Sequence, residues 1–194
     1  MACAAMMMVG CEKDNNDSDS NNKTNNGGAA PEVNLRDNQA SMNGNVIDVQ
    51  SSVAYQINAQ GENRYFVDAL CDNPEVSIRL DLYESIVGKT VNLAKPQSAG
   101  TEISLMVESG DIFLDQEIHP GDGTTEPYIG YNGTVNGTDV QGEGSMFKSG
   151  TLKVARTAET GFVLVCSGVL FNDTEIAVRV VVPEADIDVW NSNK

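Results

Sequence analysis

Apolar and polar residues alternate along much of the chain after residue 45. The alternation is cleanest over residues 76–82, 151–156 and 174–182, and in the segment where Phe162, Leu164 and Cys166 share one parity. A period of two places successive side chains on opposite faces of an extended strand. No segment shows the three-to-four-residue spacing of an amphipathic helix. The pattern therefore predicts an all-β fold.

About ten strands are expected, separated by turn residues at intervals of roughly 8–12 positions. Asn-Gly pairs at 132–133 and 136–137 predict hairpin turns, because both residues accept positive φ. Residues 151–182 form a three-strand meander, expected at the centre of one sheet, and residues 187–190 could add an edge strand. Turns of varied length favour an antiparallel β-sandwich over the alternative, a calycin-like β-barrel. The remaining expected strands are 46–49 with 53–57, 64–71, 76–82, 87–93, 102–108, 112–118, 128–131 and a weaker one near Val140 and Phe147.

The N-terminus has a different pattern from the rest of the chain. Residues 1–10 are almost wholly apolar and uncharged, and Met8, Val9 and Gly10 precede Cys11. Ten residues are too few to cross a bilayer core, but they suit the apolar middle of a secretory signal. Residues 12–31 are rich in Asn, Asp, Ser and Gly, a composition that does not bury enough apolar surface to fold. The chain therefore divides into an apolar leader, a tether at 11–31 and a single domain at 32–194.

The segment from Met8 to Cys11 resembles the lipobox of bacterial lipoproteins. The resemblance implies that residues 1–10 are a signal peptide removed before Cys11, and that Cys11 carries lipid such as palmitate. The acidic, Asn-rich spacer after it resembles that of Bacteroidetes surface lipoproteins, which implies an outer-membrane, cell-surface location with the membrane as a partner through the lipid anchor. No Lys or Arg precedes Met6, whereas signal peptides normally begin with one, so a different start of translation is expected.

Charge narrows the classes of partner. The formal net charge is −16, and from Glu32 onward acids outnumber bases 24 to 10, so the domain itself carries −14. Nucleic-acid binding depends on Lys and Arg neutralising phosphates, so no nucleic-acid partner is expected, and the charge also disfavours direct contact with anionic lipid. Once Cys3 leaves with the leader and Cys11 takes lipid, Cys71 and Cys166 remain. Each lies in an apolar run, so two buried free thiols are expected rather than a disulfide.

No catalytic constellation is evident. His119 is the only histidine and lies in a Gly-Pro loop, which excludes a zinc site with several histidine ligands. No G-x-S-x-G elbow accompanies it, and no phosphate loop or dinucleotide fingerprint is present. The chain is therefore expected to be non-enzymatic, with no catalytic residue and no cofactor.

Acidic residues gather between Pro96 and Phe147, an interval without any Lys or Arg. Calcium takes oxygen ligands from carboxylates and carbonyls, so Asp111, Asp122 and Glu126, in predicted loops, are candidate calcium ligands. A solvated acidic face is the preferred interpretation. A small glycan hydrolase is an alternative, since two carboxylates about 5–10 Å apart can act on a glycosidic bond.

Three aromatic residues are candidate ligand contacts. Tyr128 and Tyr131 flank a Gly-rich hairpin, and Trp190 lies near the expected edge strand. Their rings could stack on sugar faces, and the competing interpretation is that they cover the ends of the core. We expect a non-enzymatic cell-surface lipoprotein that binds a glycan, a nutrient or an outer-membrane protein. The structural alternative is a fimbrial subunit cut after Arg36, before Asp37.

Overall fold

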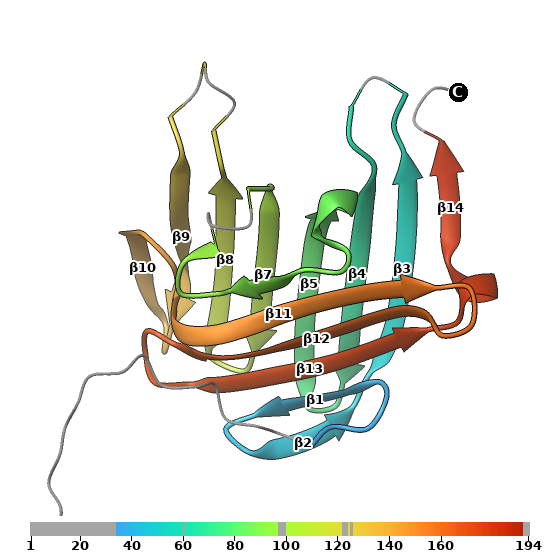
Figure 1. Ribbon diagram of the computed structural model, residues 1–194. Helices are drawn as coiled ribbons and strands as arrows, with labels where there is room; N and C mark the ends of the chain where they lie inside the picture. The colour runs from blue at the N-terminus through green and yellow to red at the C-terminus, as the bar shows by residue number, and fades with distance from the viewer. Residues whose placement is uncertain (1–33, 60, 97–99, 122–123, 125, 192–194) are drawn as a thin grey trace, which may run out of the picture.

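The computed structural model describes residues 34–59, 61–96, 100–121, 124 and 126–191. In that part of the chain fourteen strands form two β-sheets, and helical structure is limited to short 3₁₀ turns such as η1 (Glu84–Ile86) and η3 (Glu184–Asp186). The sheets stand face to face and do not close into a barrel (Figure 1). The predicted all-β sandwich is confirmed, with more strands than the ten expected. The predicted signal peptide, Cys11 and the tether lie outside the described residues.

The six-stranded sheet has the predicted meander at its centre. Its order is β2-β1-β13-β12-β11-β6. All neighbouring pairs in it are antiparallel. The predicted strand at 87–93 is reduced to β6, because Gly88 adopts a φ of 82° and interrupts the extended run. The strands are β2 (Asn45–Asp48), β1 (Gln39–Met42), β13 (Glu175–Val182), β12 (Gly161–Leu170), β11 (Phe147–Thr157) and β6 (Thr90–Asn92).

The eight-stranded sheet has the order β10-β9-β8-β7-β5-β4-β3-β14. The predicted edge strand near Trp190 is present as β14, which pairs in parallel with β3. The other pairs in this sheet are antiparallel. The strands are β10 (Thr138–Glu143), β9 (Tyr128–Val135), β8 (Ile112–His119), β7 (Ile103–Ser109), β5 (Glu75–Tyr83), β4 (Arg64–Asp72), β3 (Gln50–Ile57) and β14 (Asp188–Asn191).

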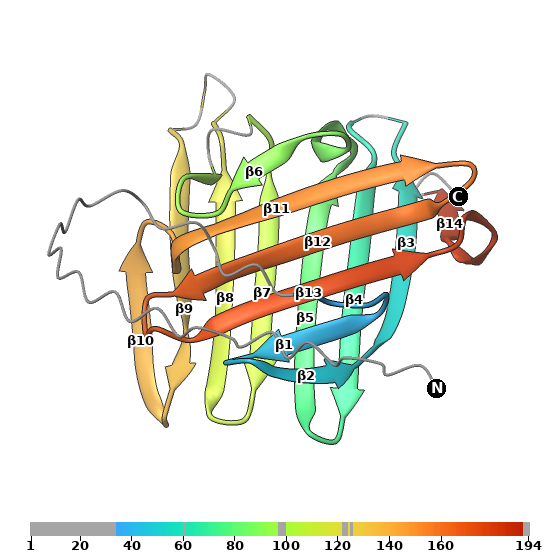
Figure 2. The same ribbon diagram turned by 60° about the horizontal axis from the view of Figure 1, so that its bottom comes forward.

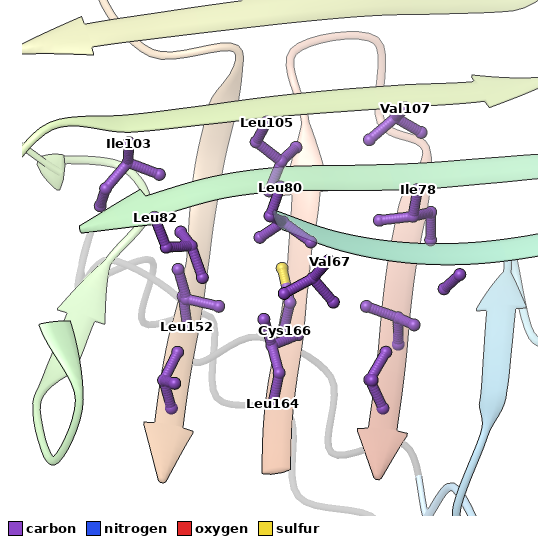
Figure 3. Packing of buried hydrophobic residues seen from close by; sticks show 14 of the residues in the cluster. Val67, Ile78, Leu80, Leu82, Ile103, Leu105, Val107, Leu152, Leu164 and Cys166 are labelled. Atoms are coloured by element: carbon purple, nitrogen blue, oxygen red, sulfur yellow. The ribbon is translucent and has the colours of Figure 1, made fainter. Parts of the chain in front are cut away.

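The two sheets enclose one apolar core. Strands of the six-stranded sheet run across those of the eight-stranded sheet rather than along them (Figure 2), as in orthogonal sheet packing. Leu80 and Leu105 from one sheet meet Leu164 and Cys166 from the other (Figure 3). Within each strand these core residues occupy alternate positions, so the period-two pattern correctly identifies the inner faces of the two sheets.

The two Asn-Gly pairs occupy different kinds of structure. Asn136 and Gly137, with φ of 51° and 70°, form the hairpin turn between β9 and β10, as predicted. Asn132 and Gly133 lie inside β9, so the prediction of a turn there is wrong. A Cβ at Gly133 would lie 1.9 Å from the carbonyl oxygen of Phe113 on β8, and its φ is 150°. Glycine at 133 therefore permits a close approach of two strands.

Cys71 and Cys166 are both free thiols, as predicted. Cys166 is buried in β12, and its burial raises the pKa of the thiol to about 12. Cys71 is only half-buried, contrary to expectation, because it is the penultimate residue of β4 at the end of the other sheet. Within the described ranges, no helix is both long and apolar enough to cross a bilayer.

Candidate functional site on the outer face of the eight-stranded sheet

The eight-stranded sheet has an outer face turned away from the six-stranded sheet. The other described elements lie on its inner side (Figures 1 and 2). Val67, Leu80 and Leu105 point into the core, so the residues of opposite parity on the same strands face outward. The strand register then identifies which outward-facing side chains are neighbours. Arg64 lies opposite Tyr83, and His119 lies opposite Tyr128.

A polar group of side chains gathers on this face at one end of the strands, where β5 and β8 finish and β4, β7 and β9 begin. Glu102 is central, immediately before β7, because its neighbour Ile103 pairs with Ile118 and so places Glu102 beside His119. We call this group the Glu102 cluster. It comprises Arg64, Asp81, Tyr83, Glu102, Glu117, His119 and Tyr128.

Arg64 and Tyr83 hold one side of Glu102. The Arg64 guanidinium lies 4.3 Å from the centre of the Tyr83 ring and donates to the Tyr83 hydroxyl. It also donates to Asp81 Oδ2 at 3.0 Å and lies 3.7 Å from Glu102 Oε1. The Tyr83 hydroxyl donates in turn to Glu102 Oε2 at 3.2 Å. The carboxylate of Glu102 is therefore fixed from two neighbouring strands.

His119 holds the other side of Glu102. Its Nδ1 lies 3.7 Å from Glu102 Oε2, and its Nε2 lies 3.8 Å from Glu117 Oε2. The imidazole stacks on Tyr128 with 6.3 Å between ring centres. Tyr128 is 50% exposed, so one face of its ring is presented to solvent. The histidine thus links two carboxylates to an accessible aromatic surface.

Burial shifts the ionisation of the cluster. Burial lowers the pKa of Arg64, but the hydrogen bond with Tyr83 and the charges of Asp81 and Glu102 outweigh it, so the net pKa is raised. Burial and the neighbouring Glu102 raise the pKa of Tyr83, and together they outweigh the lowering effect of Arg64. Burial likewise raises the pKa of Asp81 in spite of the opposing charge of Arg64. The cluster therefore presents a guanidinium and a phenol as hydrogen-bond donors beside several carboxyl groups.

A cavity of about 330 Å³ opens beside Glu102 and His119. This volume lies near the lower end of the range for small-ligand sites. Hydrogen bonds stiffen its surroundings, since Ser85 N donates to Glu62 Oε1 at 2.7 Å and Ser85 Oγ donates to Thr101 Oγ1 at 3.0 Å. The lining residues are Glu62, Tyr83, Gly100, Thr101, Glu102, His119, Pro120 and Gly121. A cavity with hydrogen-bonding walls beside an exposed ring suits a ligand with both hydroxyl groups and an apolar face.

A second cavity, of about 390 Å³, lies at a corner of the sandwich beside Arg156. The Arg156 guanidinium donates to the Tyr65 hydroxyl at 3.0 Å and to both carboxylate oxygens of Glu184, at 2.5 and 3.0 Å. It also lies 4.8 Å from the centre of the Tyr55 ring. Protein groups therefore already engage this cation, which is the arrangement of a structural clamp between β11 and η3.

The three predicted aromatic contacts separate. Tyr128 joins the Glu102 cluster. Tyr131 does not share its face, because residues three apart in a strand point to opposite sides, and it packs on Phe171 at 5.0 Å over the end of the core. Trp190 is on the outer face but at the far edge, where it stacks on Phe66 at 6.0 Å. The three candidate rings therefore do not share one surface patch, and Tyr131 packs as the competing interpretation expected.

The predicted calcium ligands do not converge. Asp111 immediately precedes β8, whereas Glu126 lies beyond the other end of β8 in the connection to β9. An eight-residue strand spans more than 20 Å, so the two carboxylates do not share one ion. Asp122 lies outside the described residues. Among those the structure does describe, no group of three or more His, Cys, Asp and Glu side chains is arranged to hold a metal.

The structure also places the acids of the glycan-hydrolase alternative and the cut site of the fimbrial alternative. Glu102 and Glu117, two of the acids available to the glycan-hydrolase alternative, both approach the imidazole of His119, at 3.7 and 3.8 Å. Arg36 is exposed just before β1, and the next residue, Asp37, accepts from Arg179 Nε on β13 at 2.8 Å. A cut after Arg36 leaves β1 paired in the sheet.

Sequence reasoning missed Arg64, Tyr83 and Glu102 as site residues. Arg64 and Tyr83 lie on β4 and β5, Glu102 immediately precedes β7, and only the register of these three strands brings them together. The signal available in the sequence is that these residues alternate with the apolar residues of the same strands, and so point to the opposite face.

Comparison with known proteins finds no relative, because no family model, no curated protein and no solved structure matches the chain.

Proposed function

We propose that the protein is a cell-surface lipoprotein that binds a glycan without chemical conversion, through the Glu102 cluster. One observation carries the glycan assignment. An exposed ring, Tyr128, is held against His119 beside a cavity whose walls carry carboxylates and a phenol. The apolar face of a sugar ring stacks on such an aromatic surface, and sugar hydroxyls both donate and accept hydrogen bonds.

The lipoprotein part of the proposal rests on the sequence. Cys11 follows a short apolar leader and precedes an acidic, Asn-rich spacer. Acyl chains on Cys11 would anchor the domain, since each buried methylene contributes about 0.8 kcal/mol. Cys11→Ser is expected to abolish palmitate labelling and release the protein from the membrane fraction, whereas Cys71→Ser retains both. Labelling that survives Cys11→Ser contradicts the anchor.

Binding of the intact chain to a panel of immobilised glycans, followed by calorimetry on each hit, tests the site. Tyr128→Ala should weaken binding about tenfold, because it removes the stacking surface. Phe113→Ala is the matched control. Phe113 is also an exposed aromatic residue on this face, 37% exposed, but it lies at the other end of β8. Equal effects of the two substitutions, or no glycan bound at all, would contradict the proposal.

A further inference from the structure

Planar side chains continue across the outer face beyond the Glu102 cluster. His119 stacks on Tyr128 at one edge, with 6.3 Å between ring centres. Arg64 lies over Tyr83 in the middle, 4.3 Å from the ring centre. Phe66 stacks on Trp190 at the other edge, with 6.0 Å between ring centres. Three stacked pairs therefore occupy β8 and β9, then β4 and β5, then β4 and β14.

The register places these pairs along one line across the strands. Trp190 pairs with Gln56, Gln56 pairs with Arg64, and Arg64 pairs with Tyr83. On β3 the residue opposite Phe66 is Ala54, whose small side chain leaves room for the contact between Phe66 and Trp190. From β9 to β14 there are six inter-strand steps. At about 4.8 Å each, the line is about 29 Å long.

Trp190 is exposed at one end of this line, as Tyr128 is at the other. It is 42% exposed on a face whose other residues are mostly polar. A large aromatic side chain that remains accessible on a polar face is a feature of binding surfaces. Its ring is supported from one side by Phe66, so it is held in place and still presents apolar area to solvent.

The charge of the face restricts what can lie along it. Asp81, Glu102, Glu117 and Asp115 all face outward here. The two arginines on the same face are already paired, Arg64 with Asp81 at 3.0 Å and Arg79 with Asp68 at 3.5 Å. A chain bearing carboxylate or sulfate groups would therefore meet like charge, which disfavours binding.

We infer that the binding surface extends from Tyr128 to Trp190 and takes a linear glycan several residues long that carries no acidic groups. This inference rests on the proposed function and adds the length and the charge of the ligand. Rings along the chain stack on the planar pairs, and hydroxyl groups between them bond to Gln56, Asp81 and Glu102. A short oligosaccharide occupies only the cavity end, next to His119.

The intact chain is titrated calorimetrically with uncharged linear polysaccharides (unsubstituted xylan, mannan and β-1,3-glucan) and with acidic ones (alginate and hyaluronan). The disaccharide and hexasaccharide of the polymer that binds are then compared. The hexasaccharide should bind at least tenfold more tightly than the disaccharide, and alginate and hyaluronan should not bind. Acidic chains that bind as well as the others overturn the charge part of the inference.

Trp190→Ala separates this inference from the proposed function. It should weaken hexasaccharide binding about tenfold and leave disaccharide binding unchanged, whereas Tyr128→Ala weakens both. Val189→Ala is the control, since Val189 is 53% exposed on the other side of the same strand. Trp190→Tyr keeps a ring and should restore most of the affinity, which excludes a folding defect. Equal binding of both oligosaccharides, with no effect of Trp190→Ala, overturns the extended surface and leaves the cavity site standing. No binding by any polysaccharide overturns both.

Discussion

At the scale of single residues, two identical dipeptides have different physical roles. Gly137 is in a tight turn with a φ of 70°, and a Cβ there would meet open space. Gly133 is inside β9 with a φ of 150°, and a Cβ there would lie 1.9 Å from the Phe113 carbonyl oxygen. Glycine is therefore required at 137 by the backbone conformation and at 133 by the approach of β8.

The two glycines predict different losses on substitution. Gly133→Ala should lower the free energy of unfolding by about 3 kcal/mol, because the backbone of β8 must move to admit the methyl group. Gly137→Ala should cost only about 1 kcal/mol, the penalty of an ordinary residue at positive φ. Urea unfolding of both variants measures the difference. Equal losses would show that the clash at 133 is relieved without cost.

Cys166 makes stability depend on pH in alkali. Burial raises the pKa of this thiol from 9.0 to about 12, so the unfolded chain loses the proton at a lower pH than the folded one. Stability from this group is complete below pH 9 and is lost as the pH rises toward 12, by up to about 1.4 kcal/mol per pH unit. Tyr55 acts in the same direction, since burial raises its pKa from 10.0 to about 12.

Cys166→Ala tests the alkaline effect. The variant should be less stable at pH 7, by about 1 kcal/mol, because it removes a buried sulfur atom. Between pH 9 and 11 its stability should fall less steeply than that of the unsubstituted chain, because the contribution of the buried thiol is absent. Urea unfolding at four pH values across this range gives both slopes. Parallel slopes would contradict the assignment to Cys166.

At the scale of elements, β1 is the strand that the sequence does not reveal. Strands with one buried face, such as β5 and β12, show the period of two. In β1 the consecutive residues Gln39, Ala40 and Ser41 are all buried, so no alternation exists. Side-chain amides at its two ends extend the pairing with β13. Asn38 Oδ1 accepts from Val181 N, and Asn43 Oδ1 accepts from Glu175 N, each at 2.9 Å.

Asn38 is the residue through which the docking of β1 can be tested. Asn38→Ala removes the acceptor for Val181 N and leaves an alanine at a φ of 56°. The expected loss of stability is about 2 kcal/mol, about 1 from the hydrogen bond and about 1 from the backbone conformation. Asn38→Gly should recover the second part only. Hydrogen exchange at the Val181 amide should accelerate in both variants, and unchanged exchange would contradict the role of Asn38.

At the scale of the whole molecule, the sequence predicts the class of fold and the meander, because one-sided burial is a local pattern. Register and the crossing of the sheets are not local properties. The neighbours Arg64, Tyr83 and Glu102 come together only through three strand pairings. The face of the sheet on which a strand residue lies, however, can be predicted from its position in the alternating pattern. The odd spacing between Tyr128 and Tyr131 places them on opposite faces, and that rule alone would have separated the two rings.

Net charge is also a property of the whole molecule, and it affects how the stability of the fold changes as the pH is lowered. From Glu32 onward the chain carries a formal charge of −14, so protonation relieves repulsion in the compact state. Burial raises the pKa of Asp81 and of Asp115, and the nearby charge of Glu117 raises the pKa of Asp115 further. A carboxyl with a raised folded-state pKa stabilises the fold in its protonated form. Stability should therefore rise as the pH is lowered from 7 toward about 4.

Asp115→Asn separates this local effect from net charge. Asp115 lies opposite Asn132 in the middle of the outer face, whereas Asp139 is an exposed carboxylate on the edge strand β10. Both substitutions remove one negative charge, but only Asp115→Asn also removes a half-buried charge beside Glu117. It should therefore raise the thermal unfolding midpoint at pH 7 more than Asp139→Asn does, and it should flatten the dependence between pH 4.5 and 7. A matched gain from the two variants would assign the whole effect to net charge, and a stability maximum at neutral pH would contradict the direction of the pKa shifts.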